Sequence, residues 1–421
     1  MSEKDAMDER LACRTKSELR RWPARGIAAT LVLVFFVAPS MAADSGFGDP
    51  VEGQAIFQSK GCVRCHAVRG AGGRIGPDLG RKVVQSSFYE IASGMWNHSP
   101  AMGERMEEFK VARPYFEGTE LADVAAFLYF LKYFDEPGDP RIGQTLFTEK
   151  HCVRCHRVAG QGGEMAPRLD TLPRTVSPLR IAQDLWNHGA AMVTAMEMQG
   201  LDVPTFQDSE IIDLLAYLRN QGQRGATAEF QSAGDPEKGR SLFQTKACDR
   251  CHAIFGSQAK LGPDLGRVEL RGSVTQIAGG MWNHWSGMAQ AMQSLGMRQP
   301  EFQGEELADL FAYIFIARYE GQPGDPDRGE NVYRMKGCAI CHRPDRKGEI
   351  GPPLVEMSSE PKESVVQKMW NHAPQMWERM RERQVPWPRL EPGELADMLS
   401  FLATEGTEES TPAEGGEGPS R

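Results

Sequence analysis

The sequence predicts an all-helical protein that consists of four similar domains in tandem. Gly-Asp-Pro starts at four positions, and each copy is followed by one copy of C-x-x-C-H. The first cysteine of this motif advances by 90, 96 and 90 residues, a period that is long for a solenoid and suits a small domain used four times. Each unit ends with an amphipathic stretch such as "ELADLFAYIF", and no segment shows convincing strand alternation.

The repeats place the domains at residues 48–135, 138–221, 234–320 and 324–405. Only a few residues join the first domain to the second and the third to the fourth. The second junction, residues 220–233, is longer and contains Gly, Ala and Ser. Because short linkers keep neighbouring domains close, we expect two tight pairs, domains 1–2 and 3–4, joined by a looser hinge.

Each domain is expected to open with a short helix, since Asp is a favourable N-cap and Pro is well placed at the first helical position. A Gly and an aromatic residue four positions later would share one face of this helix. The Gly would let the closing helix approach, and the two aromatic residues would fill the crossing. The residues are Asp49, Gly53, Phe57 and Phe127; Asp139, Gly143, Phe147 and Tyr217; Asp235, Gly239, Phe243 and Tyr313; and Asp325, Gly329, Tyr333 and Phe401.

The C-x-x-C-H motif has the spacing for a c-type haem, in which both cysteines bond to the vinyl groups and the His binds the iron. The four copies contain eight of the nine cysteines, and the ninth, Cys13, precedes the expected mature start. A zinc site would need two C-x-x-C pairs to share one metal, and a redox-active thiol pair does not explain four copies that each end in His. We therefore expect four covalently attached c-type haems. Their attachment residues are Cys62, Cys65, Cys152, Cys155, Cys248, Cys251, Cys338 and Cys341, and the iron ligands are His66, His156, His252 and His342.

A second motif, W-N-H, supplies candidates for the opposite side of each iron. A Met follows the His by four residues and another by eight, so that all three side chains would lie along one helical stripe. We expect the first Met to be the distal ligand, and the second Met and the His remain alternatives. The first set is Met102, Met192, Met288 and Met376; the second is Met106, Met196, Met292 and Met380; the His residues are His98, His188, His284 and His372. Pro100 and Pro374 suggest that in some domains the helix restarts just after the His.

The Trp of the same motif is a candidate for hydrogen bonds to haem propionates, because Trp only donates and propionates only accept. The neighbouring Asn, and the His where it is not a ligand, are candidates for the same role. Core packing is the alternative explanation for the Trp. The four residues are Trp96, Trp186, Trp282 and Trp370.

Taken together, each domain resembles a class I c-type cytochrome domain. The resemblance rests on the Gly/aromatic helix, C-x-x-C-H, the "GPDL" segment and the closing helix, and it spans about residues 48–405. It implies that the cysteines attach haem as thioethers, that the motif His is the proximal ligand, and that a Met is the distal one. It also implies that a Pro carbonyl orients each His, from Pro77, Pro167, Pro263 and Pro352. Domain 2 departs from the pattern, with "APRL" where domains 1 and 3 have "GPDL".

Both ends of the chain differ from the domains. Arg20, Arg21 and Arg25 precede an apolar run, and a small-x-small pattern ends at Ala42, which predicts a secretory signal peptide over residues 1–42. The run is shorter than the about 20 residues of a membrane span, and an uncleaved anchor is the alternative. Residues 406–421 lack apolar side chains to bury and are expected to form a disordered acidic tail. We expect a periplasmic or extracellular protein without a stable membrane span.

The net charge of −9 argues against nucleic-acid binding and predicts docking to redox partners with basic surfaces. An iron with ligands on both faces has no open position for substrate, so we expect an electron carrier rather than an enzyme. The expected function is to relay single electrons between redox partners of a respiratory or photosynthetic chain. Alternatives are a haem-bearing subunit of a dehydrogenase or reductase complex and an extracellular conduit. An enzyme with one open haem is disfavoured because no domain lacks either Met.

Overall fold

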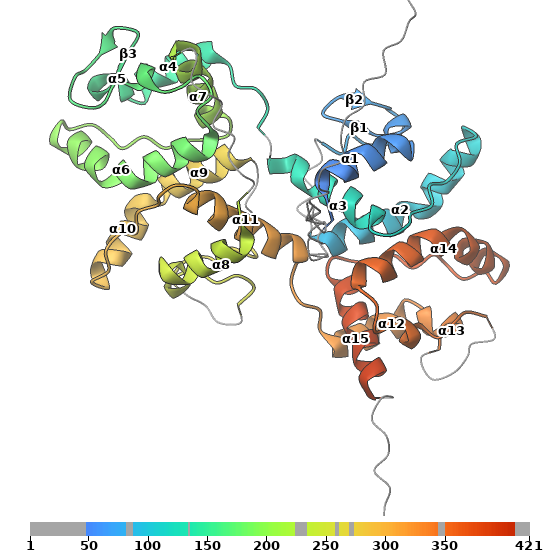
Figure 1. Cartoon of the computed structure of the whole chain (residues 1–421). Coiled ribbons are helices and arrows are strands. Elements are labelled where there is room, and N and C mark those ends of the chain that lie inside the picture. Colours follow the sequence, from blue (N-terminus) through green and yellow to red (C-terminus); the bar gives the residue numbers. More distant parts are fainter. Residues whose placement is uncertain are drawn as a thin grey trace, which may run out of the picture. The chain divides into compact units, whose positions relative to one another are not determined.

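The computed structural model describes residues 48–80, 87–133, 135–223, 234–256, 261–268, 273–343 and 350–408. The predicted signal segment, Cys13 and residues 409–421 of the predicted tail lie outside these ranges. Residues 406–408, which we assigned to the tail, are instead the end of the last helix. Within them the chain is largely helical, and four repeats of one arrangement follow each other (Figure 1). The prediction of an all-helical fold with four tandem domains is confirmed.

Each repeat contains an opening helix, a turn with the cysteine motif, a long helix and a closing helix. The opening helices are α1 (Pro50–Ser59), α4 (Pro140–Glu149), α8 (Pro236–Thr245) and α12 (Pro326–Met335). The motif turns are η1 (Cys62–Arg64), α5 (Cys152–Cys155), η4 (Cys248–Arg250) and α13 (Cys338–Cys341). The long helices are α2 (Phe88–Glu108), α6 (Pro178–Met198), α9 (Val274–Asn283) with α10 (Trp285–Ser294), and α14 (Lys362–Glu382). The closing helices are α3 (Glu120–Phe130), α7 (Glu210–Gln221), α11 (Glu306–Glu320) and α15 (Glu394–Glu408).

Smaller elements complete the repeats. Three further 3₁₀ turns are η2 (Leu131–Tyr133), η3 (Leu169–Thr171) and η5 (Leu354–Met357). Two antiparallel hairpins, β1 (Ala67–Val68) with β2 (Ala71–Gly72) and β3 (Arg157–Val158) with β4 (Gln161–Gly162), follow the motif in repeats 1 and 2. The sequence did not predict them, because strands of two residues are too short to show alternation.

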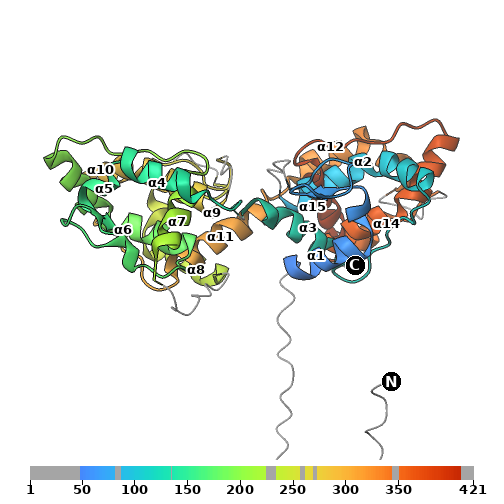
Figure 2. The ribbon, with the colours of Figure 1, turned by 90° about the horizontal axis from the view of Figure 1, so that it is seen from above.

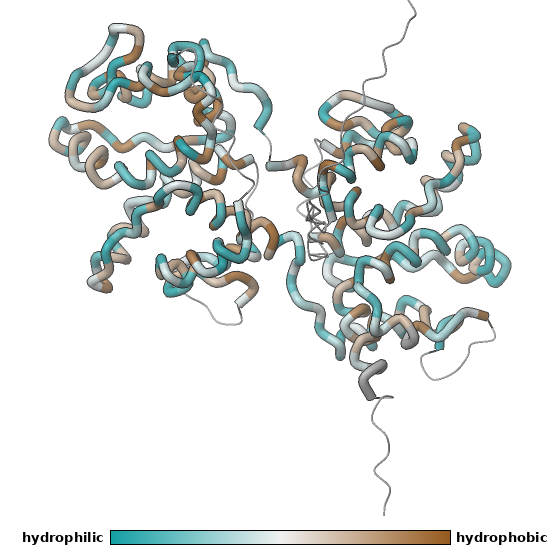
Figure 3. The backbone as a smooth tube through the Cα atoms, in the orientation of Figure 1, coloured by the Kyte–Doolittle hydropathy of each residue, from teal (hydrophilic) through white to brown (hydrophobic). Residues whose placement is uncertain are grey.

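The opening helix is built as predicted. Asp49 caps α1 by accepting hydrogen bonds from the N–H groups of Val51 and Glu52, and Asp139, Asp235 and Asp325 cap the equivalent helices in the same way. A Cβ on Gly53 would lie only 1.9 Å from the backbone oxygen of Asp123 on α3, so the crossing requires a glycine. The rings of Phe57 and Phe127 lie beside it with centroids 5.6 Å apart. The closing helices are among the most apolar segments of the repeats (Figure 3).

The prediction that proline restarts the long helix is wrong. Helices α2 and α14 continue through Pro100 and Pro374, whereas the break occurs in repeat 3, at His284 between α9 and α10. Pro100 cannot donate a hydrogen bond to the Trp96 carbonyl, but the indole N–H of Trp387 donates to this oxygen instead, at 3.1 Å. A side chain from repeat 4 thus replaces the missing helical bond.

The repeats pair differently from our prediction. Helix α2 of repeat 1 packs against α14 of repeat 4, and α6 of repeat 2 packs against α9 of repeat 3, as Figure 1 and Figure 2 both show. The expected pairs 1–2 and 3–4 are therefore wrong. A short linker brings the ends of consecutive domains close together, but it does not decide which helix faces pack.

Each pair is held by a set of hydrogen bonds that we call the clasp. The Trp of W-N-H donates through its indole nitrogen to a Pro carbonyl of the partner repeat, and the Asn exchanges two bonds with the backbone two residues further on. The Trp bonds are Trp96 to Pro388, Trp370 to Pro114, Trp186 to Pro300 and Trp282 to Pro204, at 2.7–2.9 Å. The Asn partners are Asn97 with Leu390, Asn371 with Phe116, Asn187 with Phe302 and Asn283 with Phe206. Each repeat of a pair contributes a Trp-Asn side-chain pair and a Pro-containing backbone segment. The clasp is therefore self-complementary, like the interface of a two-fold dimer.

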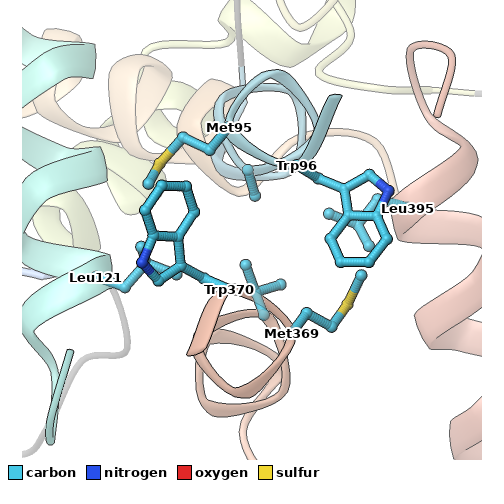
Figure 4. A pocket seen from close by; sticks show the side chains of 8 residues that line it. Met95, Trp96, Leu121, Met369, Trp370 and Leu395 are labelled. Carbon is cyan, nitrogen blue, oxygen red and sulfur yellow. The ribbon is translucent and has the colours of Figure 1, made fainter. Parts of the chain in front are cut away.

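The two helices of a pair meet at their apolar faces. Between repeats 1 and 4, Met95 and Trp96 of α2 face Met369 and Trp370 of α14 across a small pocket (Figure 4). Each Met lies near the Trp of the opposite helix. The apolar contact therefore lies beside the clasp, since Trp96 and Trp370 take part in both.

A buried tyrosine cluster joins the two pairs through repeats 1 and 3. Tyr129 donates to the carbonyl of Phe315 at 2.7 Å, and Tyr133 stacks on the Phe315 ring with centroids 3.9 Å apart. Tyr319 donates to the carbonyl of Ala122. In space, the contacts therefore connect the repeats in the order 4–1–3–2.

Candidate functional site

The four cysteine motifs have one backbone geometry. In each, the N–H of the His bonds to the carbonyl of the first cysteine at 2.9 Å, which closes a single turn. The residue before this cysteine has a positive φ and is Gly61, His151, Ala247 or Gly337. This explains His151, which stands outside both sequence motifs and occupies a turn position that favours glycine. The turn brings both cysteines and the His of a motif close together.

All eight motif cysteines are partly buried. Burial raises the pKa of the first cysteine in each repeat, Cys62, Cys152, Cys248 and Cys338, to about 11. None of the eight motif cysteines forms a disulfide.

The four prolines that the resemblance indicated lie beside the motif His. The His Nδ1 atom is 2.9–3.0 Å from the carbonyl oxygen of Pro77, Pro167, Pro263 or Pro352. This hydrogen bond fixes the tautomer and leaves Nε2 with its lone pair available for an iron. His66, His156, His252 and His342 are therefore each held by a Pro carbonyl with Nε2 unprotonated, which is the form of the ring that can bind a metal.

The residue before each Pro lies against the His ring. A Cβ on Gly76 would be 2.4 Å from the ring of His66, and Gly262 and Gly351 are similarly close to His252 and His342. Repeat 2 has Ala166 here, and the hydrogen bond from its N–H to Cys155 is 3.1 Å, compared with 2.8 Å for Gly76 to Cys65. The loop of repeat 2 thus accommodates the extra methyl group with a longer bond.

The tryptophans do not have the role that we predicted. Each indole N–H donates to a Pro carbonyl in the clasp, so the predicted hydrogen bond to a haem propionate is wrong for Trp96, Trp186, Trp282 and Trp370. The side-chain amide of each Asn is also used in the clasp. Sequence alone could not distinguish the two acceptors, because a carbonyl and a propionate accept the same hydrogen bond.

The three distal candidates have different surroundings. The W-N-H histidines are exposed, and Nδ1 of His98, His188 and His284 bonds to the carbonyl four residues earlier. The first methionines, Met102, Met192, Met288 and Met376, are partly buried and pack against the main apolar core in all four repeats. The second methionines, Met106, Met196, Met292 and Met380, are partly buried to a similar degree, but they are not part of that packing.

Two sets of residues that sequence reasoning missed anchor the two ends of the opening helix to the closing helix. A Lys two positions before the first cysteine pairs with the first Glu of the closing helix at 2.7–2.8 Å. These pairs are Lys60–Glu120, Lys150–Glu210, Lys246–Glu306 and Lys336–Glu394. A buried Asp of the closing helix accepts a bond of 2.7 Å from the N–H of the capping Asp, and this set is Asp123, Asp213, Asp309 and Asp397. These Lys, Glu and Asp residues recur at the same positions in all four repeats, and this recurrence in the sequence could have identified them.

Comparisons with known proteins agree with the geometry. A family model described as Cytochrome c matches the chain four times, at residues 50–132, 141–222, 236–315 and 326–405. The chain belongs to the cytochrome c family. A cytochrome c-553-like protein of Synechocystis sp. is 30% identical to it over 101 residues, which cover 23% of this chain and 87% of the relative. No solved structure matches.

Membership of the cytochrome c family assigns the cofactor and the general role. The eight motif cysteines fit four covalently attached c-type haems, and the chain is a haem-bearing electron-transfer protein whose partners are redox proteins. Among the described residues, no group of three or more His, Cys, Asp or Glu side chains is arranged to hold a bare metal ion. No helix in this part of the chain is both long and apolar enough to cross a membrane.

Proposed function

We propose that this cytochrome is an exported electron carrier that passes single electrons between redox partners of a respiratory or photosynthetic chain. The observation that supports it best is the His–Pro hydrogen bond, which recurs in all four repeats within 0.1 Å. Four equivalent ligand sites on one chain suit relay better than a single specialised reaction. Each haem, when bound, supplies one-electron chemistry, while the chain orients the ligand and excludes water.

The proposed proximal ligands are His66, His156, His252 and His342, and the proposed distal ligands are the first methionines, Met102, Met192, Met288 and Met376. Packing of the first methionines against the core supports this choice, because a ligand must be held in place by its surroundings. Methionine opposite histidine raises the reduction potential of a haem, which suits the high-potential side of a chain.

Export and partner choice belong to the same proposal. The basic and apolar segments within residues 1–42 support secretion, and the mature protein would act in the periplasm or outside the cell. The net charge of −9 supports docking to partners with basic surfaces. Electron-transfer rates with a small basic redox protein should therefore fall as salt is added, and rates independent of salt would contradict this docking.

Two measurements on the purified mature protein test the proposal. Its intact mass should equal the mass of the polypeptide from residue 43 onward plus the mass of four haems. A mass equal to that of the polypeptide alone would reject the proposed function. The near-infrared spectrum of the oxidised protein should then show sulfur-to-iron bands from four haems.

Matched methionine variants test the distal ligand. Met102→Ala should remove about a quarter of the sulfur-to-iron band and open one haem to carbon monoxide, whereas Met106→Ala should leave the band unchanged. The reverse result would assign the ligand to the second methionine. If neither variant changed the band, the distal ligand of repeat 1 would be His98 or another residue.

A further inference from the structure

Repeat 4 differs from the others at the aromatic position of its opening helix. This residue is Phe57, Phe147 or Phe243 in the first three repeats and Tyr333 in the fourth. The ring lies in the same place in all four, with its centroid 5.6–5.7 Å from the aromatic ring of the closing helix. The hydroxyl group is therefore the new element in repeat 4, and it is buried, because Tyr333 is only 1% exposed.

The hydroxyl of Tyr333 is directed at the motif. It donates a hydrogen bond to the backbone carbonyl of His342, the His of the fourth C-x-x-C-H. The backbone N–H of His342 bonds to Cys338, and its ring bonds to Pro352. Tyr333 thus adds a contact to the residue that we propose as proximal ligand, and a phenylalanine cannot make this contact.

We propose that Tyr333 is a positioning residue that gives the haem of repeat 4 a higher reduction potential than a phenylalanine would. This inference rests on the proposed role of His342 as an iron ligand. A carbonyl oxygen carries partial negative charge, which favours the more positive, oxidised iron. The hydroxyl hydrogen offsets part of that charge inside an apolar core, where such dipoles act strongly. Hydrogen bonds to the groups around a haem are an established means of tuning its potential.

The test is a spectroelectrochemical titration of Tyr333→Phe in the full-length, haem-loaded protein. The change is isosteric and installs the residue found in the other repeats, so the fold should be retained. We expect one of the four one-electron potentials to move to a lower value and three to stay. In the oxidised NMR spectrum, the haem methyl signals of one haem should shift while the other three sets remain.

Tyr319→Phe is the matched control. It also removes a buried tyrosine hydroxyl that bonds to a backbone carbonyl, that of Ala122, but this carbonyl lies outside the four motifs. The control should leave all four potentials unchanged. Equal shifts in both variants, no shift in Tyr333→Phe, or a variant that carries only three haems would overturn the inference. Absence of haem from the wild-type protein would instead reject the proposed function.

Discussion

The two repeat pairs share one clasp but cover it with different side chains. Between repeats 1 and 4, the residues that precede the clasp prolines are Arg113 and Trp387. The Trp387 ring stacks on Trp96 with centroids 4.2 Å apart, and the Arg113 guanidinium lies 3.9 Å from the centroid of the Trp370 ring. Between repeats 2 and 3, the equivalent residues are Val203 and Gln299. Gln299 donates a hydrogen bond to the Trp186 carbonyl at 2.8 Å and has no aromatic ring to stack on the indole.

The pair formed by repeats 2 and 3 has an additional aromatic contact at a different position, next to the His of W-N-H. Trp285, directly after the His of W-N-H in repeat 3, is buried against Gly189 of repeat 2. At the same positions, repeats 1 and 4 have Ser99 and Ala373. Since a Cβ on Gly189 would lie 2.8 Å from the Trp285 ring nitrogen, Trp285 fits opposite a glycine but not opposite Ser99 or Ala373. The clasp bonds are thus the same in both pairs, whereas the fit of Trp285 against Gly189 favours repeat 2 over repeats 1 and 4 as the partner of repeat 3.

The largest expected effect is the separation of the two halves of a chain that is cut between repeats 2 and 3, once their contacts are weakened by substitution. A specific protease site introduced between residues 223 and 234 divides the chain into repeats 1–2 and repeats 3–4. Both clasps and the tyrosine cluster cross this cut, so the halves should remain together in size-exclusion chromatography after cleavage. Asn97→Ala, Asn187→Ala and Tyr129→Ala combined in the cleaved protein should release them. If the unsubstituted halves separated, the pairing described here would be incorrect.

The structure within one repeat could be predicted because its determinants are local. Asp49 and the Pro after it indicate the start of a helix, Gly53 and Phe57 indicate where that helix crosses another, and C-x-x-C-H indicates a c-type haem. Pairing could not be predicted, because W-N-H is identical in all four repeats and carries no information about its partner. That information lies in contacts such as Trp285 with Gly189, which are 96 residues apart in the sequence and become neighbours only on folding.

Substitution of Trp387 should destabilise pair 1–4 more than substitution of Gln299 destabilises pair 2–3. Trp387→Ala removes a stacked ring and the donor to Trp96, whose usual helical donor is absent at Pro100, and should cost about 2–4 kcal/mol. Gln299→Ala should cost about 0.5–1.5 kcal/mol, because Ala190 inside α6 can still donate to the Trp186 carbonyl. Denaturant unfolding of both variants measures the difference. Equal costs would show that the covering residue has no role in stability.

Glycine substitutions test the fit of Trp285. Alanine is the better helix former by about 1 kcal/mol, but at Gly189 its Cβ would overlap Trp285, so Gly189→Ala should cost about 1–2 kcal/mol net. Gly280→Ala in α9 is the control, since a Cβ there would meet nothing within 4 Å. It should stabilise the protein by about 0.5–1 kcal/mol. A stabilising Gly189→Ala would remove the steric basis for the pairing preference.

The smallest expected effect is on acid unfolding, and it concerns the buried Asp of the closing helix. In repeat 4 this residue is Asp397, and Arg328 donates two bonds to its carboxylate at 2.9 Å. In repeats 1 and 2 the equivalent carboxylates accept a bond from the hydroxyl of Thr119 or Ser209 instead. Burial alone would raise the pKa of Asp397, but the bonds from Arg328 and the Asp325 N–H, with the charge of Arg328, hold it below its ordinary value. The contact therefore stabilises the fold above the unfolded pKa of about 3.9, and this stabilisation is lost as pH falls through the lower, folded pKa.

Arg328→Ala leaves the burial of Asp397 without its cationic partner, so acid unfolding should begin at higher pH than in the wild type, while stability near neutral pH falls only modestly. Arg334→Ala is the control, because it removes an exposed ion pair with Glu330 on the same helix and should leave the acid transition in place. Unfolding followed by circular dichroism as a function of pH measures both. An unchanged acid transition in Arg328→Ala would mean that the bonds from Arg328 to Asp397 do not set the pH at which the protein unfolds.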